Sequence, residues 1–105
     1  MKIKEGVDLT GCYVFEHLGN ALFEVDQWLQ ENGHDELTIT SGVEGKHSKN
    51  SRHYIGMALD FRTRNYGSEL QKALVDLMRK KCNERGIGTI VILESNHIHL
   101  QINKI

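Results

Sequence analysis

Hydrophobic residues recur every three or four positions in two stretches of the chain, a spacing that places side chains on one face of an α-helix. The first stretch covers residues 13–32 and is followed by Gly33, a residue type that commonly ends helices. The second covers residues 68–85, and residues 68–71 match a capping box that begins with Ser68. The sequence therefore predicts two amphipathic helices, with the apolar stripes Leu18, Leu22, Val25, Leu29 and Leu70, Leu74, Leu77.

Four shorter stretches alternate between apolar and polar residues or are rich in β-branched residues, which is typical of β-strands. They cover residues 37–40, 57–61, 89–93 and 97–102. Ser95 and Asn96 are expected to form a two-residue hairpin turn between the last two strands. Residues 41–52 are polar, lack any period and are predicted to form a loop.

The order of these elements is helix, strand, loop, strand, helix and hairpin. This order predicts an α+β domain in which two helices pack on one face of a small, mainly antiparallel sheet. A chain of 105 residues with 39% hydrophobic content is too short for two separate cores. Residues 1–105 are therefore expected to form a single domain.

Charge and composition exclude several classes of function. Lys and Arg number 13 against 14 Asp and Glu, so the chain lacks the basic excess that nucleic-acid binding requires. There is neither a run of 18 apolar residues nor a signal-peptide pattern, which predicts no membrane span and synthesis as a cytoplasmic protein. Cys12 and Cys82 form no C-x-x-C pair and are expected to be buried free thiols.

The candidate chemistry lies at polar positions of the predicted strands. His97 and His99 are two residues apart in an alternating strand, so their side chains point to the same face. The hairpin turn would place Glu94 directly opposite His97 on that face. Asp60 occupies the polar face of its own strand, and Gly56 and Ala58 would leave space beside it. A bend at Gly56 could bring the His53 ring back towards Asp60.

Two histidines and one aspartate suit a hydrolytic zinc site, which has three protein ligands and one open position for water. The metal lowers the pKa of a bound water towards ~7, and a carboxylate such as Glu94 would accept its proton during attack on a carbonyl. The histidine that is not a ligand would stabilise the developing oxyanion or orient a ligand. The alternative interpretation is a metal-free domain whose histidines are incidental.

Residues 51–60, SRHYIGMALD, match the motif S-x-H-x-x-G-x-A-x-D. Together with the H-x-H at 97–99, this segment resembles the M15 family of zinc D-Ala-D-Ala carboxypeptidases and dipeptidases. The match extends backwards through residues 40–42 and 47–48. The pattern also resembles the amino-terminal signalling domain of hedgehog proteins, which shares the zinc site but is known for binding partners. Both resemblances imply a hedgehog/DD-peptidase-like fold.

The resemblance implies that His53, Asp60 and His99 are the zinc ligands. It makes Glu94 the general base, and it makes His97 a residue that stabilises the transition state or orients a ligand. Some members of the family use E-x-x-H with that histidine as a ligand, which would make His97 the third ligand instead.

One departure from the family concerns the substrate. Many of these peptidases follow Ser-Gly with Tyr-Arg, and the arginine helps to bind substrate. Here Ser41-Gly42 is followed by Val43-Glu44, so the residue that binds a substrate carboxylate is unassigned. His47 is a candidate for lining the site, and four basic residues are candidates for the carboxylate: Lys46, Arg52, Arg62 and Arg64.

The resemblance implies a monomeric zinc peptidase that cleaves bacterial cell-wall (peptidoglycan) peptides, as a carboxypeptidase or an endopeptidase. Its expected partner is the peptide substrate, with neither nucleic acid nor membrane. Without a signal peptide, it is expected to be a phage or prophage lytic enzyme released to the cell wall by other means, or a small cytoplasmic peptidase. The alternative is a zinc-stabilised binding module of the hedgehog type that has lost catalysis.

Overall fold

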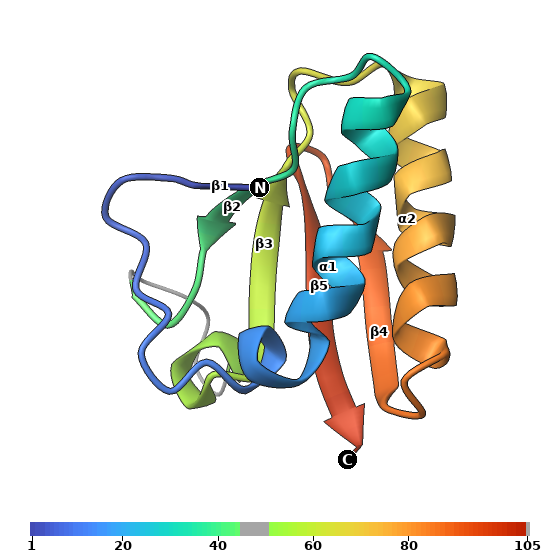
Figure 1. Ribbon diagram of the computed structural model, residues 1–105. Helices are drawn as coiled ribbons and strands as arrows, with labels where there is room; N and C mark the ends of the chain where they lie inside the picture. Colours follow the sequence, from blue (N-terminus) through green and yellow to red (C-terminus); the bar gives the residue numbers. More distant parts are fainter. Residues whose placement is uncertain (45–50, 105) are drawn as a thin grey trace.

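The computed structural model describes residues 1–44 and 51–104, and Figure 1 shows how their elements are arranged. Two long helices stand in front of a small sheet, and a short 3-10 helix, η1, precedes the central strand β3. In chain order the elements are β1 (Lys2–Ile3), α1 (Tyr13–Glu31), β2 (Thr38–Ser41), η1 (Arg52–Ile55), β3 (Ala58–Arg62), α2 (Ser68–Asn83), β4 (Gly88–Leu93) and β5 (His97–Lys104).

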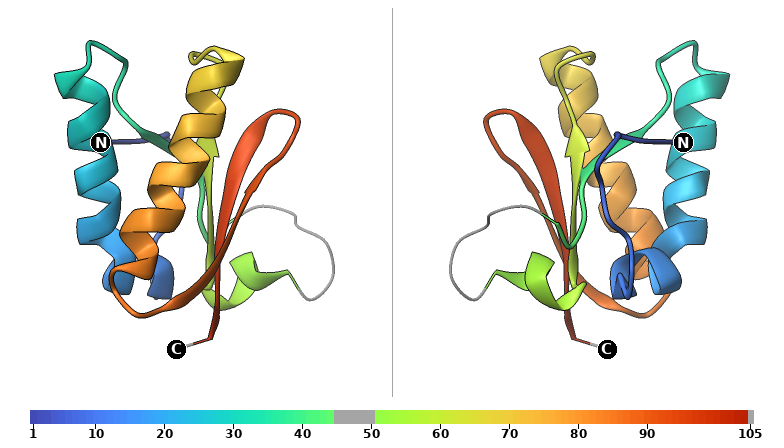
Figure 2. Two further views of the ribbon diagram at one scale, coloured as in Figure 1. Left: turned by 90° about the vertical axis from the view of Figure 1, so that its right-hand side faces the viewer. Right: turned by 90° about the vertical axis from the view of Figure 1, so that its left-hand side faces the viewer.

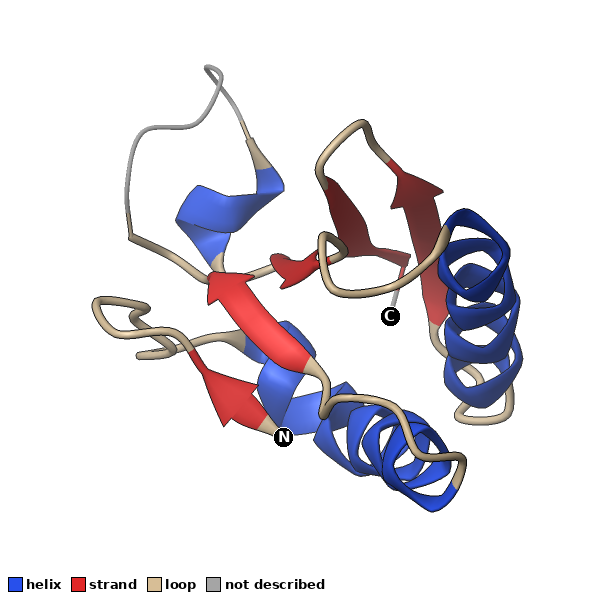
Figure 3. Ribbon diagram, turned by 90° about the horizontal axis from the view of Figure 1, so that it is seen from above, coloured by secondary structure: helices blue, strands red, loops and turns tan. Residues whose placement is uncertain are grey.

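The strands form one mixed sheet in the order β1-β2-β3-β5-β4. β1 pairs with β2 in parallel, whereas the other three pairings are antiparallel. Both helices lie on the same side of this sheet, as the side views and the view along the strands show (Figure 2, Figure 3). The predicted α+β class, with two helices on one face of a mainly antiparallel sheet, is confirmed. The hedgehog-like part of that prediction remains a resemblance.

The helix-facing side of the sheet forms the core. Alternation along β3 and β5 turns Phe61, Ile98 and Leu100 inward, where their side chains are fully buried in one core with residues of both helices. Burial of one side chain of this size stabilises the fold by about 1.5–3 kcal/mol. The predicted apolar stripe of α1 is buried completely, and α2 contributes Leu74 and Met78.

The start of α2 differs from the prediction. The helix begins at Ser68 with Gly67 as its N-cap, and no side chain caps it. Gln71 donates its amide N–H groups to the carbonyl oxygens of Thr63 and Tyr66, at 3.0 and 2.9 Å. A capping box needs this side chain to accept a hydrogen bond from a backbone N–H. The capping-box prediction is wrong, because the N-cap is Gly67 and Ser68 already lies inside the helix.

One strand and one buried acid were not predicted. β1 has only two residues, too few for any alternation to show in the sequence. Asp26 of α1 is 5% exposed and accepts hydrogen bonds from the Leu37 N–H at 2.9 Å and the Met1 ammonium at 2.7 Å. Burial alone would raise the pKa of Asp26, but these bonds and one from Gln30 outweigh burial, so the pKa lies below its ordinary value. Asp26 thus ties the start of the chain and the entry to β2 onto α1.

Two other predictions can be compared with the structure. Cys12 and Cys82 are buried free thiols, as expected, and burial raises the pKa of Cys82 to about 11. Within residues 1–44 and 51–104, neither long helix combines the length and apolar character needed to cross a membrane.

Candidate metal centre

The face of the sheet opposite the helices carries a cluster of ionisable side chains. In the β3–β5 pairing, Asp60 lies directly opposite His99, and Arg62 lies opposite His97. The preceding 3-10 helix adds His53, which is 3% exposed. One donor atom from each of His53, Asp60 and His99 can be chosen so that all three lie within 4.8 Å of one another. This His-His-Asp group could hold a metal ion.

His53 is placed by a tight local structure. Ser51 caps η1, its hydroxyl accepting a hydrogen bond from the His53 backbone N–H at 3.2 Å, and Gly56 ends it in the left-handed conformation with φ of 72°. The ring Nδ1 lies 2.9 Å from the carbonyl oxygen of Gly42. A carbonyl oxygen can only accept, so Nδ1 carries the proton. The unprotonated Nε2 then faces Asp60 Oδ2 at 3.3 Å.

His99 has a similar arrangement with its two nitrogens exchanged. Its Nε2 lies 2.8 Å from the side-chain carbonyl oxygen of Gln101, and its Nδ1 lies 3.0 Å from Asp60 Oδ1. Gln101 donates its amide to Asn103 at 2.6 Å, which is consistent with this orientation of the amide. In the neutral ring, Nε2 therefore holds the proton and Nδ1 points its lone pair at Asp60.

Both histidines thus turn a lone pair towards one carboxylate, an arrangement that requires a cation between the groups. In the metal-free protein a proton on the facing ring nitrogen would serve, because the protonated ring donates a hydrogen bond to Asp60. The hydrogen bond to Asp60 raises the pKa of His99, although burial opposes the shift. Burial by itself would raise the pKa of Asp60, but hydrogen bonds from His53 and His99 hold it well below its ordinary range. A metal ion would replace the proton at the same place.

His97 and Glu94 lie at the edge of this group. His97 Nε2 is 3.6 Å from Asp60 Oδ1, and His97 is not among the three residues whose donor atoms converge. The predicted hairpin is present, since the Glu94 N–H donates to the His97 carbonyl at 2.8 Å. Glu94 is exposed, and its negative charge contributes to the raised pKa of His99. Both histidines lie on one face, where they pair with Arg62 and Asp60 of β3. That Glu94 shares this face stays a prediction, because β4 ends at Leu93.

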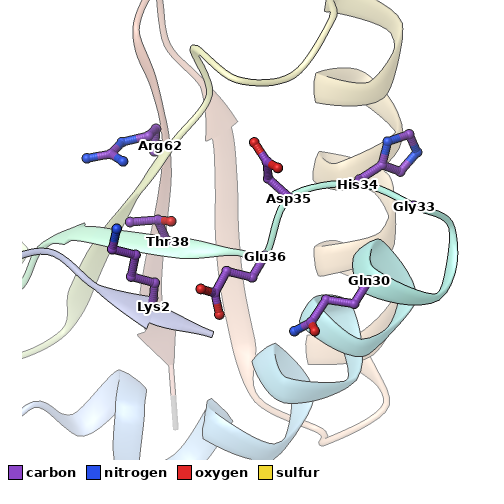
Figure 4. A pocket seen from close by; sticks show the side chains of 8 residues that line it. All are labelled: Lys2, Gln30, Gly33, His34, Asp35, Glu36, Thr38 and Arg62. Carbon is purple, nitrogen blue, oxygen red and sulfur yellow. The ribbon is translucent and has the colours of Figure 1, made fainter.

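The structure also places the candidate basic residues. Arg62 lies on the metal-centre face, two residues beyond Asp60, whereas Arg64 is exposed in the turn after β3. Figure 4 shows Arg62 and Lys2 at one end of an open pocket of about 620 Å³. In the described part of the chain, neither of these two side chains forms an ion pair. Arg52 lies in η1, and Lys46 and His47 lie outside the described residues.

None of His53, Asp60 and His99 lines this pocket, and Arg62 is the residue of β3 that does. Its far side carries two acids that already have partners. Asp35 accepts a hydrogen bond from Asn65 at 3.2 Å, and Glu36 pairs with the Met1 ammonium at 3.1 Å. The unpaired basic end is therefore the part of the pocket closest in the sheet to the metal centre.

Several residues that shape the centre were not identified from the sequence. Gln101 was detectable, because it follows His99 by two positions and so shares its face. Gly42 was not, because it contributes a backbone carbonyl from the segment after β2. Gly56 had been expected to leave space beside Asp60. Instead, a Cβ there would lie 2.4 Å from the Gly11 carbonyl oxygen, so the glycine permits close packing of the N-terminal segment.

Comparisons with known proteins add no support for any activity. No protein-family model matches the chain. A search of curated proteins likewise found no match. Function is therefore inferred from the motif residues and from the geometry of the centre.

Proposed function

We propose that this protein is a zinc-dependent peptidase that acts on bacterial cell-wall peptides. The observation that carries the proposal is the pairing of each histidine with a carbonyl oxygen, Gly42 for His53 and Gln101 for His99. Metal-binding histidines usually donate their second ring N–H in this way, which fixes the tautomer and aims the other nitrogen at the metal. An incidental pair of surface histidines would have no reason to share this pattern around one buried carboxylate.

The donor set is shared by two classes of metal site. Two imidazoles and one carboxylate with an open position are the ligands of many hydrolytic zinc sites. Non-haem Fe(II) oxygenases use the same donor types. The resemblance to M15 peptidases and the glutamate beside the centre favour zinc. Metal analysis of protein purified without added metal would distinguish the two ions.

The residues around the centre have distinct roles in the proposed reaction. When bound, zinc would act as a Lewis acid and lower the pKa of a water molecule towards ~7. The Glu94 carboxylate, next to His97 across the hairpin, would accept the proton of that water and later deliver it to the leaving amine. His97 would stabilise the developing oxyanion with an N–H. This N–H must be on Nε2, because Nδ1 lies 2.6 Å from the Asn96 side-chain oxygen and is already engaged there.

Arg62 is our candidate for binding the substrate carboxylate. It lies directly opposite His97 in the sheet, and Lys2 lies at the same end of the pocket. Both side chains lack an acidic partner among the described residues. A peptide with a free C-terminus would thus find a cation two residues along β3 from Asp60 of the metal centre. This arrangement favours a carboxypeptidase over an endopeptidase.

The test is cleavage of purified peptidoglycan peptides ending in D-Ala-D-Ala, with and without chelator, followed by zinc addition. Glu94→Gln should lower kcat by about 100- to 10,000-fold, the range for loss of a general base, while zinc stays bound. Glu5→Gln, which changes an exposed glutamate elsewhere, should have no effect. Stoichiometric zinc without cleavage by the wild type would instead support the zinc-stabilised binding module. Absence of stoichiometric metal would contradict both proposals.

The remaining parts of the proposal concern assembly and location. We propose that the domain acts as a monomer, because all three converging ligands come from one chain. A lytic role at the cell wall follows from the family resemblance. Sedimentation or light scattering would test the first point, and lysis of cell-wall preparations would test the second.

A further inference from the structure

Glu44 joins the end of β2 to the N-terminal segment of the chain. Its Oε1 accepts hydrogen bonds from the backbone N–H groups of Gly42 and Asp8, both at 2.8 Å. Its Oε2 accepts a hydrogen bond from the Ser41 hydroxyl at 3.2 Å. Two N–H groups, one from the N-terminal segment and one from the end of β2, therefore converge on one carboxylate oxygen. Hydrogen bonds to an ionised acceptor are about twice as strong as those between neutral groups.

Gly42 has little freedom within this arrangement. The next residue, Val43, donates its N–H to the Asp8 carbonyl oxygen at 2.9 Å. A Cβ at Gly42 would lie only 2.2 Å from that same oxygen, so the two backbones are in direct contact. Asp8 is itself held in a turn, because its side chain accepts the Thr10 N–H at 2.8 Å. The peptide units on both sides of Gly42 are thus anchored.

The Gly42 carbonyl is the acceptor that determines the proton position on His53. Its oxygen lies 2.9 Å from His53 Nδ1 in a buried contact. A rotation of this peptide would remove the acceptor and allow the proton to move to Nε2, the nitrogen that faces Asp60. The orientation of one backbone carbonyl therefore decides whether His53 can offer a lone pair to a metal.

We propose that Glu44 is a positioning residue for His53, acting through Gly42 on the ring tautomer and direction. The inference rests on the proposed metal centre. It gives a physical reason for the departure of residues 43–44 from the family pattern. Two backbone N–H groups point at one place, and only a side chain with an acceptor oxygen can satisfy both. An arginine at this position would offer donors alone.

The first readout needs no metal. Ring ¹⁵N chemical shifts of His53 at pH 8, in metal-free protein, report which nitrogen carries the proton. The wild type should show the Nδ1–H tautomer, and Glu44→Ala should show a mixture. Glu44→Gln keeps an oxygen at the Oε1 position and should restore the wild-type pattern. Glu5→Ala, which removes an exposed carboxylate from the same N-terminal region, should change nothing.

The second readout is zinc affinity, measured by competition with a chelator. Loss of a group that orients a metal ligand weakens metal binding about 10- to 100-fold. Because Glu44 acts through one intervening residue, Glu44→Ala should weaken zinc binding by about 10-fold, the lower end of this range. The zinc affinity of Glu44→Gln should stay within about 3-fold of the wild type. Cobalt-loaded Glu44→Ala should also show a shifted visible absorption spectrum, since the direction of one ligand has changed.

A wild-type tautomer and wild-type zinc affinity in Glu44→Ala would overturn the inference, even if its melting temperature falls. If that variant does not fold, Glu44→Asp replaces it, because a side chain one methylene shorter keeps the charge but cannot span both N–H groups. An unchanged tautomer in Glu44→Asp would likewise overturn the inference. Failure of the wild type to bind zinc would refute the proposed function, whereas the tautomer comparison would still decide the role of Glu44.

Discussion

Asp60 and His99 face each other across the β3–β5 pairing, with Asp60 Oδ1 3.0 Å from His99 Nδ1. The lone pair of a neutral His99 and the charge of Asp60 repel each other unless a cation lies between them. A proton and a metal ion therefore compete for one place. This relationship makes the stability of the metal-free protein and its affinity for metal depend on pH in opposite directions.

The stability of the metal-free protein should decrease as pH rises above about 6.5, the unfolded pKa of histidine. His99 has a raised pKa in the folded state, so its contribution is complete below the unfolded pKa and is lost as pH rises through the folded value. Asp60 has a lowered pKa, so its contribution is present above about 3.9, the unfolded value, and is lost only in stronger acid. Urea unfolding at a series of pH values measures both effects.

Zinc-saturated protein should show the opposite slope near neutrality, because each deprotonation favours metal binding. His99→Gln should flatten the metal-free profile above about pH 6.5, the unfolded histidine pKa, whereas His17→Gln, at an exposed position on α1, should not. Identical slopes with and without zinc would show that metal does not occupy the place of the proton.

Gln101→Ala should weaken zinc binding about 10- to 100-fold, because His99 would lose the acceptor that fixes its tautomer. The metal-free fold should change little, since the side chain of Gln101 is only partly buried. Chelator competition measures the affinity, and Gln27→Ala on the surface of α1 is the matched control. Equal affinities for the two variants would remove Gln101 from the centre.

Arg62→Gln should raise KM about 10- to 100-fold for peptides with a free C-terminus, the effect expected for loss of a charge-assisted hydrogen bond. The kcat value should change much less. Arg64→Gln, in the exposed turn two residues later, should match the wild type. A peptide with an amidated C-terminus should be cleaved equally poorly by wild type and Arg62→Gln. If the wild type cleaves the amidated peptide as well as the free acid, Arg62 does not bind the carboxylate.

Gly42→Ala should destabilise the protein by about 1–3 kcal/mol, as overpacking commonly does, because the new Cβ would lie 2.2 Å from the Asp8 carbonyl oxygen. Zinc affinity should fall with it, since the displaced peptide carries the acceptor of His53. Gly19→Ala is the control, because no atom lies within 4 Å of its added Cβ. In the middle of α1 this change should stabilise by about 0.5–1 kcal/mol. Denaturant unfolding measures both variants.

Local periodicity allowed the main elements of the fold to be predicted. The apolar stripe of α1 and the alternation of β3 and β5 encode which side chains face the core, because helix and strand geometry repeat over a few residues. The same alternation predicted that Asp60, His97 and His99 would lie on polar faces. It could not reveal β1, whose two residues are extended because they pair with β2, which follows α1 in the chain.

The same distinction between local pattern and tertiary structure applies to the metal centre. The sequence by itself determined the residue types and the face that each occupies, because these follow from spacing within single strands. Only the tertiary structure decided that His53 and His99 converge on Asp60 while His97 stays at 3.6 Å, and that Gly42 and Glu44 hold one of the rings. Those relationships join segments distant in the chain, so strand register, glycine contacts and backbone carbonyls establish them, and none leaves a periodic signal in the sequence.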